Sequence, residues 1–341
     1  MKSTINNIFN YSALALSLLV TFNTACTSEK DLDTDVIVNE TVKSDSEISF
    51  NDNEDGTDPS LIFCGDQYIY IIDAQKAYSS RYQNAVIESW NAASIADTIG
   101  LSENLCKYLT DCKPVNDGKD LLVTSYNGWS ILLNLETMDV PFYTINSFGA
   151  HSADLLPNDR VAVACANPGN QIQVYDLDTP NKIISSVQIS GAQGVAWDAD
   201  LNLLFAINQE SLNSYRLVDW SSNHPSLELV ASVPTPKKGM KDLTVVSSNT
   251  LCVAGAGSYI YNISDNTFTE MTQFSSSKVL NSMNYNGKTG EVWYTDATVP
   301  AGRAIWSTRS LSYSNNVNGS GGASEISISD LDVYAVRVLH W

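Results

Sequence analysis

A short apolar run that ends in a polar turn recurs five times along this chain. The turn residues that close the five runs are Asp73, Asn134, Asp176, Arg216 and Asn262. Successive turns are separated by 61, 42, 40 and 46 residues. A period in the forties that is built from short strands is typical of the blades of a β-propeller. The repeat therefore predicts an all-β ring of four-stranded blades around a central channel.

The two ends of the repeat predict how the ring closes. The first blade begins at residues 61–64 with what reads as a second strand, and no inner strand precedes it. Residues 333–341 form a spare strand at the other end of the chain. Because an unpaired strand edge is a liability, we expect this last strand to complete the first blade.

This closure gives six blades. A seventh would have to come from an insertion at 91–110, which is short for a blade and where we expect a helix starting at Ser102. Residues 311–324 are rich in Ser, Asn and Gly, and they predict a surface loop.

The first 60 residues predict export and a membrane tether. Lys2, an apolar stretch at 14–22 and small residues before Cys26 predict a lipoprotein signal peptide at 1–25, with lipidation of Cys26. The alternative is ordinary cleavage near Ala25, which leaves Cys26 free. Residues 26–60 hold eleven acidic and two basic residues, a composition that predicts a disordered tether. We therefore expect an exported protein held to the outer membrane by its lipid alone, with the propeller exposed at the cell surface.

Residues 61–341 are long enough to bury a large core as one propeller domain. They contain 27 acidic and 16 basic residues without a basic patch, so nucleic acid is not an expected partner. We expect a monomer. Cys64, Cys165 and Cys252 fall on second strands and are expected to pack in the core. Cys106 and Cys112 are close enough in sequence to bridge in an exported protein, and the sequence leaves both states open.

A ring of polar residues is predicted where the inner strands begin. His151, Gln193 and Lys241 each stand ten residues before the start of a second strand, and corresponding polar residues occur in the neighbouring blades. The candidate ligand-binding residues are Lys113, His151, Asp154, Gln193, Lys241, Asp242 and Asn281. Polar groups that converge on a concave mouth are suited to bind a small ligand. The alternative is that these residues only meet water in the channel, with His151 bonded to a neighbouring backbone.

Four segments carry a resemblance to a known family. They are residues 61–66, 111–115, 149–157 and 191–198, with the sequences LIFCGD, DCKPV, GAHSADLLP and GAQGVAWD. They are similar to a family of exported bacterial propeller proteins with a domain of unknown function, over nearly all of 61–341. That family is sometimes labelled as pyrroloquinoline-quinone-binding quinoproteins. It tends to place a second His where this chain has Gln193, and a His-Asp pair where this chain has Lys241 and Asp242.

The residues do not favour the quinoprotein label. The turns at 135–139 and 177–181 lack the Gly-Lys-x-x-Trp docking motif that quinone-dependent dehydrogenases repeat, and no calcium-binding carboxylate cluster appears. Three scattered His residues do not predict a metal site, so we expect neither a metal nor a cofactor.

The function that the sequence favours is ligand binding, with a glycan as the expected ligand, because aromatic residues are plentiful and their faces stack on sugars. The alternative is a glycan-active enzyme such as a polysaccharide lyase. In that reading His151 is the candidate catalytic base, a Tyr is the acid, and Lys113 or Lys241 neutralises a uronate. A quinoprotein-like oxidoreductase is the least favoured reading.

Overall fold

The structure is a computed structural model, and it describes residues 59–271, 278–298, 306–314 and 324–340. The predicted signal peptide, the lipidation site at Cys26 and nearly all of the acidic tether lie outside the described residues.

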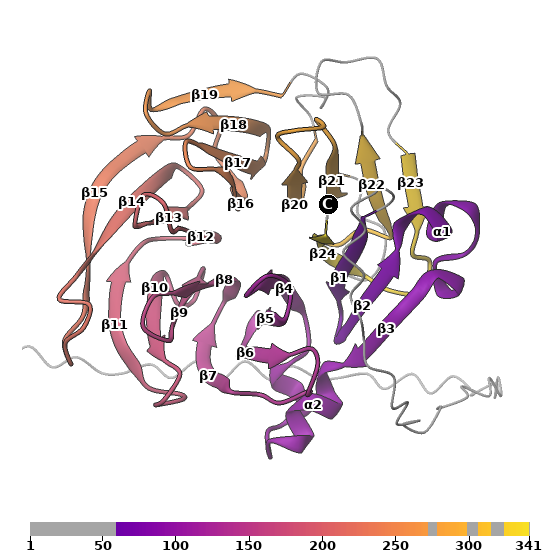
Figure 1. Ribbon diagram of the computed structural model, residues 1–341, viewed down its shortest axis with the longest axis horizontal. Helices are drawn as coiled ribbons and strands as arrows, with labels where there is room; N and C mark the ends of the chain where they lie inside the picture. The colour runs from indigo at the N-terminus through magenta and orange to yellow at the C-terminus, as the bar shows by residue number, and fades with distance from the viewer. Residues whose placement is uncertain (1–58, 272–277, 299–305, 315–323, 341) are drawn as a thin grey trace, which may run out of the picture. The chain divides into compact units, whose positions relative to one another are not determined.

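Six antiparallel four-stranded sheets stand in a ring and form a six-bladed β-propeller, as the repeat predicts (Figure 1). From the inner to the outer strand, the first three blades are β24 (Val333–His340), β1 (Ser60–Gly65), β2 (Tyr68–Asp73), β3 (Val86–Asn91); β4 (Leu109–Val115), β5 (Asp120–Ser125), β6 (Asn127–Asn134), β7 (Phe142–Phe148); and β8 (Ala150–Leu156), β9 (Arg160–Cys165), β10 (Gln171–Asp176), β11 (Ile183–Gln188). The other three are β12 (Gly194–Asp198), β13 (Leu203–Ile207), β14 (Ser211–Val218), β15 (Ser226–Pro234); β16 (Met240–Ser247), β17 (Thr250–Gly255), β18 (Ser258–Asn262), β19 (Thr267–Glu270); and β20 (Leu280–Tyr285), β21 (Val292–Asp296), β22 (Ser310–Ser314), β23 (Ser324–Ser327).

The closure prediction is confirmed, because β24 is the inner strand of the first blade. It pairs antiparallel with β1, with Phe63 opposite Val336 and Ile62 opposite Arg337. In Figure 1 the yellow β24 lies beside the indigo β1 near the centre of the ring. The two ends of the described fold are therefore held in one sheet, which leaves no open blade edge between them.

The strands follow from the sequence pattern. The second strand of each blade is flanked by a blade on either side, so β9 reads as a continuous apolar run, Arg-Val-Ala-Val-Ala-Cys, and is buried throughout. The turn from β8 to β9 places Asn158 and Asp159 at φ of 63° and 53°. Two consecutive positive φ values suit a tight hairpin, and Asn and Asp tolerate them best.

The core is divided among the interfaces between blades. Six clusters of buried residues each join two neighbouring blades. The first blade is packed on both sides: Ile62 faces the second blade with Trp129, and Phe63 faces the sixth with Trp293. Closure of the ring is thus a matter of side-chain packing as well as of strand pairing.

Four short helices interrupt the first two blades. They are α1 (Ala74–Ser79), η1 (Tyr82–Ala85), α2 (Ala92–Thr98) and η2 (Glu103–Leu105). The helix expected at Ser102 is the one-turn 3-10 helix η2, and the Ser102 hydroxyl caps it by accepting a hydrogen bond from the Asn104 amide. The larger part of the insertion is α2, which the sequence analysis did not identify.

The prediction of a surface loop at 311–324 is wrong at both ends, and its middle part, 315–323, lies outside the described residues. Residues 311–314 belong to β22, and Ser324 begins β23. Leu311 is fully buried, and Leu311 and Tyr313 alternate with serines in the two-residue period of a strand. Because the segment is rich in serine, the sequence analysis predicted a loop and did not recognise the strand period.

Candidate functional site

Five of the six inner strands share an irregularity close to the residue at which the strand begins. They carry a β-bulge at the same position, where one extra residue stands out of the pairing with the second strand. These extra residues are Thr110, His151, Lys241, Asn281 and Tyr334. The sixth inner strand, β12, has no bulge, and Gln193 directly precedes it, with its amide bonded to the Ile207 carbonyl. We call these six residues the mouth ring. A bulge re-aims the side chain of its extra residue, and bulges are frequent beside functional sites.

His151 is held by two aromatic neighbours. Its Nδ1 lies 2.9 Å from the Tyr334 hydroxyl, and the Tyr126 ring meets the imidazole edge to face with centroids 5.9 Å apart. Burial, aided by the charge of Lys241, lowers the pKa of His151 to about 4. Burial also raises the pKa of Tyr334, so the phenol keeps its proton. At neutral pH the pair is therefore a neutral imidazole beside a neutral phenol.

Lys241 and Asn281 form the second pair of the mouth ring. The Lys241 ammonium donates to Asn281 Oδ1 over 2.7 Å, and the Asn281 amide donates to the backbone carbonyl of Trp306. Burial lowers the pKa of Lys241, because the charged form loses hydration. Across the ring, no side-chain hydrogen bond holds Gln193 within the described part of the chain.

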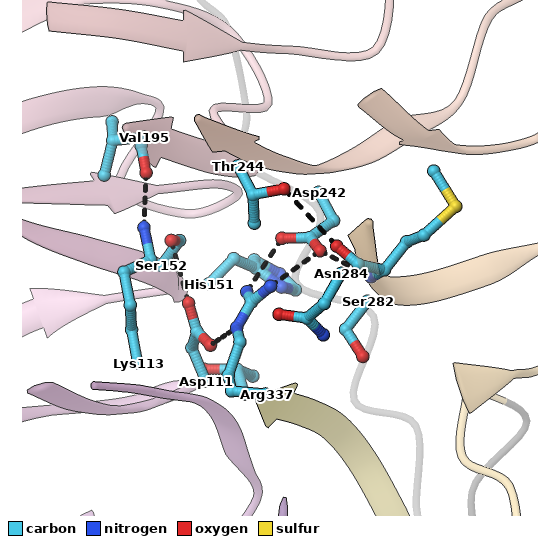
Figure 2. A network of polar contacts seen from close by, with 12 residues as sticks. Asp111, Lys113, His151, Ser152, Val195, Asp242, Thr244, Ser282, Asn284 and Arg337 are labelled. Atoms are coloured by element: carbon cyan, nitrogen blue, oxygen red, sulfur yellow. Dashed lines mark hydrogen bonds and ion pairs between the residues drawn. The ribbon is translucent and has the colours of Figure 1, made fainter. Parts of the chain in front are cut away.

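Beneath the mouth ring, Arg337 joins three blades (Figure 2). Its Nε donates to Asp111 over 2.8 Å, and its two terminal nitrogens donate to the two oxygens of Asp242, each over 2.8 Å. Ser152 donates to Asp111, and the Met283 amide donates to Asp242. We call Asp111, Asp242 and Arg337 the Arg337 cluster. Its three side chains are buried, at 1%, 3% and 4% exposure respectively.

The charges of the Arg337 cluster stabilise one another. Burial alone would raise the pKa of Asp242, but the charge of Arg337 and the hydrogen bonds outweigh it and hold that pKa below its usual range. Burial likewise disfavours the charged guanidinium, yet Asp111 and Asp242 raise the pKa of Arg337. The bidentate geometry with Asp242 is the strong form of such a bond. The cluster is thus a buried polar unit whose hydrogen bonds are satisfied by protein groups.

Lys113 and Asp154 form a further brace between blades. The Lys113 ammonium lies 3.3 Å from Asp154 Oδ2 and donates to the Val195 carbonyl over 2.6 Å. The same carboxylate oxygen accepts the Trp197 amide. One ion pair therefore links the second, third and fourth blades, and both of its side chains are bonded to other protein groups.

The structure divides the seven candidate residues into two groups. His151, Gln193, Lys241 and Asn281 lie together in the mouth ring. Lys113, Asp154 and Asp242 are instead engaged in the inter-blade network below it.

The sequence analysis missed Thr110, Tyr334 and Arg337, and it did not place Asp111 among the candidate residues. One signal was available for Arg337, since it is the single charged residue in the apolar strand Val-Tyr-Ala-Val-Arg-Val-Leu. A lone charge in a buried strand implies a buried partner.

Exposed aromatic side chains gather at the same end of the ring. Five of the six aromatic residues that are classed as exposed in the described chain lie in loops or strand ends near the start of the inner strands: Tyr68, Tyr108, Tyr126, Phe148 and Trp306. The sixth, Tyr78, lies on α1, which follows the opposite end of β2. An aromatic face that remains in water is available for stacking.

Other predicted features have plain outcomes. The five described cysteines are free thiols, so Cys106 and Cys112 are not bridged, and Cys64, Cys165 and Cys252 are buried as expected. Within the described ranges, no three His, Cys, Asp or Glu side chains gather as a metal ion would require. No described helix is long and apolar enough to span a membrane.

The comparisons with known proteins add little. No protein-family model matches the sequence, and no curated protein matches it. Solved structures do match. One of them, described as the crystal structure of the mitotic checkpoint complex, is 14% identical, with 80% of this chain and 77% of that chain covered and a TM-score of 0.48. A likeness of that size carries no argument about function.

Proposed function

We propose that this protein is a ligand-binding module, and that its mouth ring and the surrounding aromatic side chains bind a glycan. The observation that carries this proposal is the contrast in hydrogen bonding along the inner strands. Below the mouth ring, the network is satisfied by protein groups, whereas the side chain of Gln193 and two protons of the Lys241 ammonium have no hydrogen-bond partner among the described residues. Polar groups left open beside exposed aromatic faces match the two needs of a sugar, hydrogen bonds for its hydroxyls and a flat apolar surface for its ring.

The test is a glycan array followed by thermal-shift titration of the hits. We expect at least one oligosaccharide to bind and to raise the melting temperature. Trp306→Ala removes an exposed ring at the mouth and is expected to weaken binding. Leu201→Ala is the matched control, because Leu201 is an exposed apolar residue in the β12–β13 turn at the other end of the ring. An array without a hit, together with no thermal shift from mono- or oligosaccharides, would count against the proposal.

A second candidate is a glycan lyase, and the pairing of His151 with Tyr334 favours it. A lyase removes a proton beside a uronate carboxylate, protonates the leaving oxygen and neutralises the carboxylate with a cation. His151, Tyr334 and Lys241 supply these residue types within one ring. A pKa of about 4 makes His151 a weak base, however, which is why binding without catalysis is the leading proposal. Unsaturated products that absorb in the ultraviolet, and that disappear in His151→Ala, would establish the lyase.

The setting of this module is part of the proposal. The resemblance of 61–341 to exported bacterial propellers, and the predicted lipidation of Cys26, favour a monomer tethered to the outer membrane at the cell surface. Metabolic labelling with an alkyne fatty acid tests the anchor. We expect label on the parent protein and none on Cys26→Ala, while equal labelling of both would contradict the lipid anchor.

A further inference from the structure

Lys241 differs from every other basic side chain in the described part of the chain. Six described basic residues have no carboxylate within ion-pair distance, and five of the six are solvent-exposed: Lys76, Arg81, Lys119, Lys182 and Lys288. Lys241 alone is both partly buried and without a carboxylate. The two other cations on the inner strands, Arg337 and Lys113, are both paired.

This arrangement has an energetic cost. A charge withdrawn from water without an opposite charge loses hydration that a single neutral acceptor does not replace. The only side-chain acceptor that Lys241 has in the described structure is Asn281 Oδ1. Asp242 is adjacent in sequence, but both of its oxygens are bound by Arg337. An anion placed at the Lys241 ammonium would recover the lost interaction.

The surroundings of Lys241 indicate what kind of anion fits. His151 is neutral and close enough for its pKa to respond to the Lys241 charge. Its Nδ1 is occupied by Tyr334, and among the described residues no hydrogen-bond partner contacts Nε2. Below lie three carboxylates, Asp111, Asp154 and Asp242, balanced by only two cations. That excess negative charge disfavours a dianion such as phosphate and favours a group with one charge.

We propose that the mouth ring binds the carboxylate of an acidic sugar at the Lys241 ammonium, with Asn281 holding the ammonium in place. The ligand class is therefore a uronic-acid oligosaccharide. This inference rests on the proposed glycan-binding function and names its specificity. The carboxylate meets the one shielded cation that lacks a carboxylate among the described residues, and the sugar rings extend toward exposed aromatic residues such as Tyr126 and Trp306. Tyr126 contacts the His151 ring, and the backbone of Trp306 is bound by Asn281, so both lie beside the proposed anion site.

The experiment is calorimetric titration of the full chain with a galacturonate trisaccharide and with its carboxyl-reduced, neutral counterpart. We expect the acidic trisaccharide to bind at least about tenfold more tightly, since a charge-assisted hydrogen bond contributes more than a neutral one. Lys241→Met is expected to remove that difference, and Lys241→Arg to retain most of it. Lys182→Met is the matched control, because Lys182 is an exposed cation directly before β11, with no described carboxylate within ion-pair distance. It should bind both ligands as the parent does.

The outcomes separate the two proposals. Equal binding of both trisaccharides by the parent protein overturns the carboxylate site and leaves glycan binding standing. If neither trisaccharide binds but free galacturonate does, and Lys241→Met abolishes that binding, the carboxylate site is supported and oligosaccharide binding fails. If none of the three binds, the carboxylate site is overturned, and the glycan array decides whether glycan binding stands. If Lys241→Met does not fold, the salt dependence of ligand binding by the parent protein tests the carboxylate site. Its affinity for the acidic ligand must fall as salt rises while its affinity for the neutral ligand does not, and two equal salt dependences overturn the inference.

Discussion

Arg337 and Lys241 are both cations on inner strands of the same ring, but only Arg337 is paired with carboxylates. Arg337 has two carboxylates, all of its side-chain nitrogens are engaged, and it is almost wholly buried. Lys241 has one neutral acceptor and remains partly accessible. A buried charge that serves the fold is satisfied within the fold. A shielded charge that the fold leaves unsatisfied is available for another molecule.

The residues around the two cations also differ in how strongly they connect the blades. The Arg337 cluster joins β4, β16 and β24, so it links the strand that closes the ring to the neighbouring second blade and to the non-adjacent fifth blade. The mouth ring above it consists of five side chains on bulges and Gln193, with few bonds between blades. Substitutions in the Arg337 cluster should therefore affect stability first, whereas substitutions in the mouth ring should affect binding first.

The largest expected effect comes from removing β24 altogether. Deleting residues 333–341 takes away the partner of β1, the buried side chains of Val333 and Val336, and Arg337 itself. The loss is comparable to the whole stability of a typical domain, about 5–15 kcal/mol. We expect an aggregated or unfolded product in size-exclusion chromatography and thermal melting.

Deletion of residues 27–58 is the control for that truncation. The sequence predicts this segment to be a disordered tether, so its loss should leave the melting temperature unchanged. A C-terminal truncation that stays monomeric and melts with the parent would show that closure of the ring does not depend on β24.

A smaller effect is expected from Arg337→Met, which leaves Asp111 and Asp242 buried without their cation. Removing one partner of a buried ion pair costs about 3–5 kcal/mol. The pH dependence gives a second readout. In the parent the pKa of Asp242 is depressed, so its contribution is present above the usual range of an Asp and is lost only as pH falls through the folded value.

In Arg337→Met, the shift of the Asp242 pKa has the opposite sign. Burial without Arg337 raises the pKa of Asp242, so the folded variant gains a proton as pH falls and is stabilised relative to the parent. Urea unfolding at pH 7 and pH 5 should show the difference between the two proteins shrinking at the lower pH. A difference that stays constant or grows would mean that Asp242 does not depend on Arg337 for its charge.

The next effect concerns His151 and acid. Its pKa falls from 6.5 to about 4 in the folded protein, so the neutral form is the one that folding favours. The stability that this contributes is fully present above pH 6.5 and is lost as pH falls toward 4. Between pH 7 and pH 4.5 the parent should lose about 2–3 kcal/mol more than His151→Gln in urea unfolding, at 1.36 kcal/mol per pKa unit. Parallel losses in the two proteins would show that His151 is not shielded from water.

The sequence predicted the ring better than it predicted the site, for a physical reason. Strand pairing within a blade is local and periodic, so the repeat revealed the blades, and the missing first inner strand revealed the closure by residues 333–341. The Arg337 cluster joins residues 226 and 95 positions apart, and no local pattern encodes such a contact. The bulges add one residue to an inner strand without a change in composition. From the sequence, Tyr334 was therefore assigned only to the closing strand, although it contacts His151 in the mouth ring.

The most direct test of the account is the free energy of unfolding of Lys241→Met at pH 7, measured by urea titration beside the parent and Arg337→Met. Loss of the bond to Asn281 is offset by removal of a desolvated charge, so we predict a change of less than about 1 kcal/mol. Arg337→Met should lose about 3–5 kcal/mol in the same experiment. If Lys241→Met instead loses as much as Arg337→Met, then Lys241 is a structural charge like Arg337, and the division between a closed core and an open mouth is wrong.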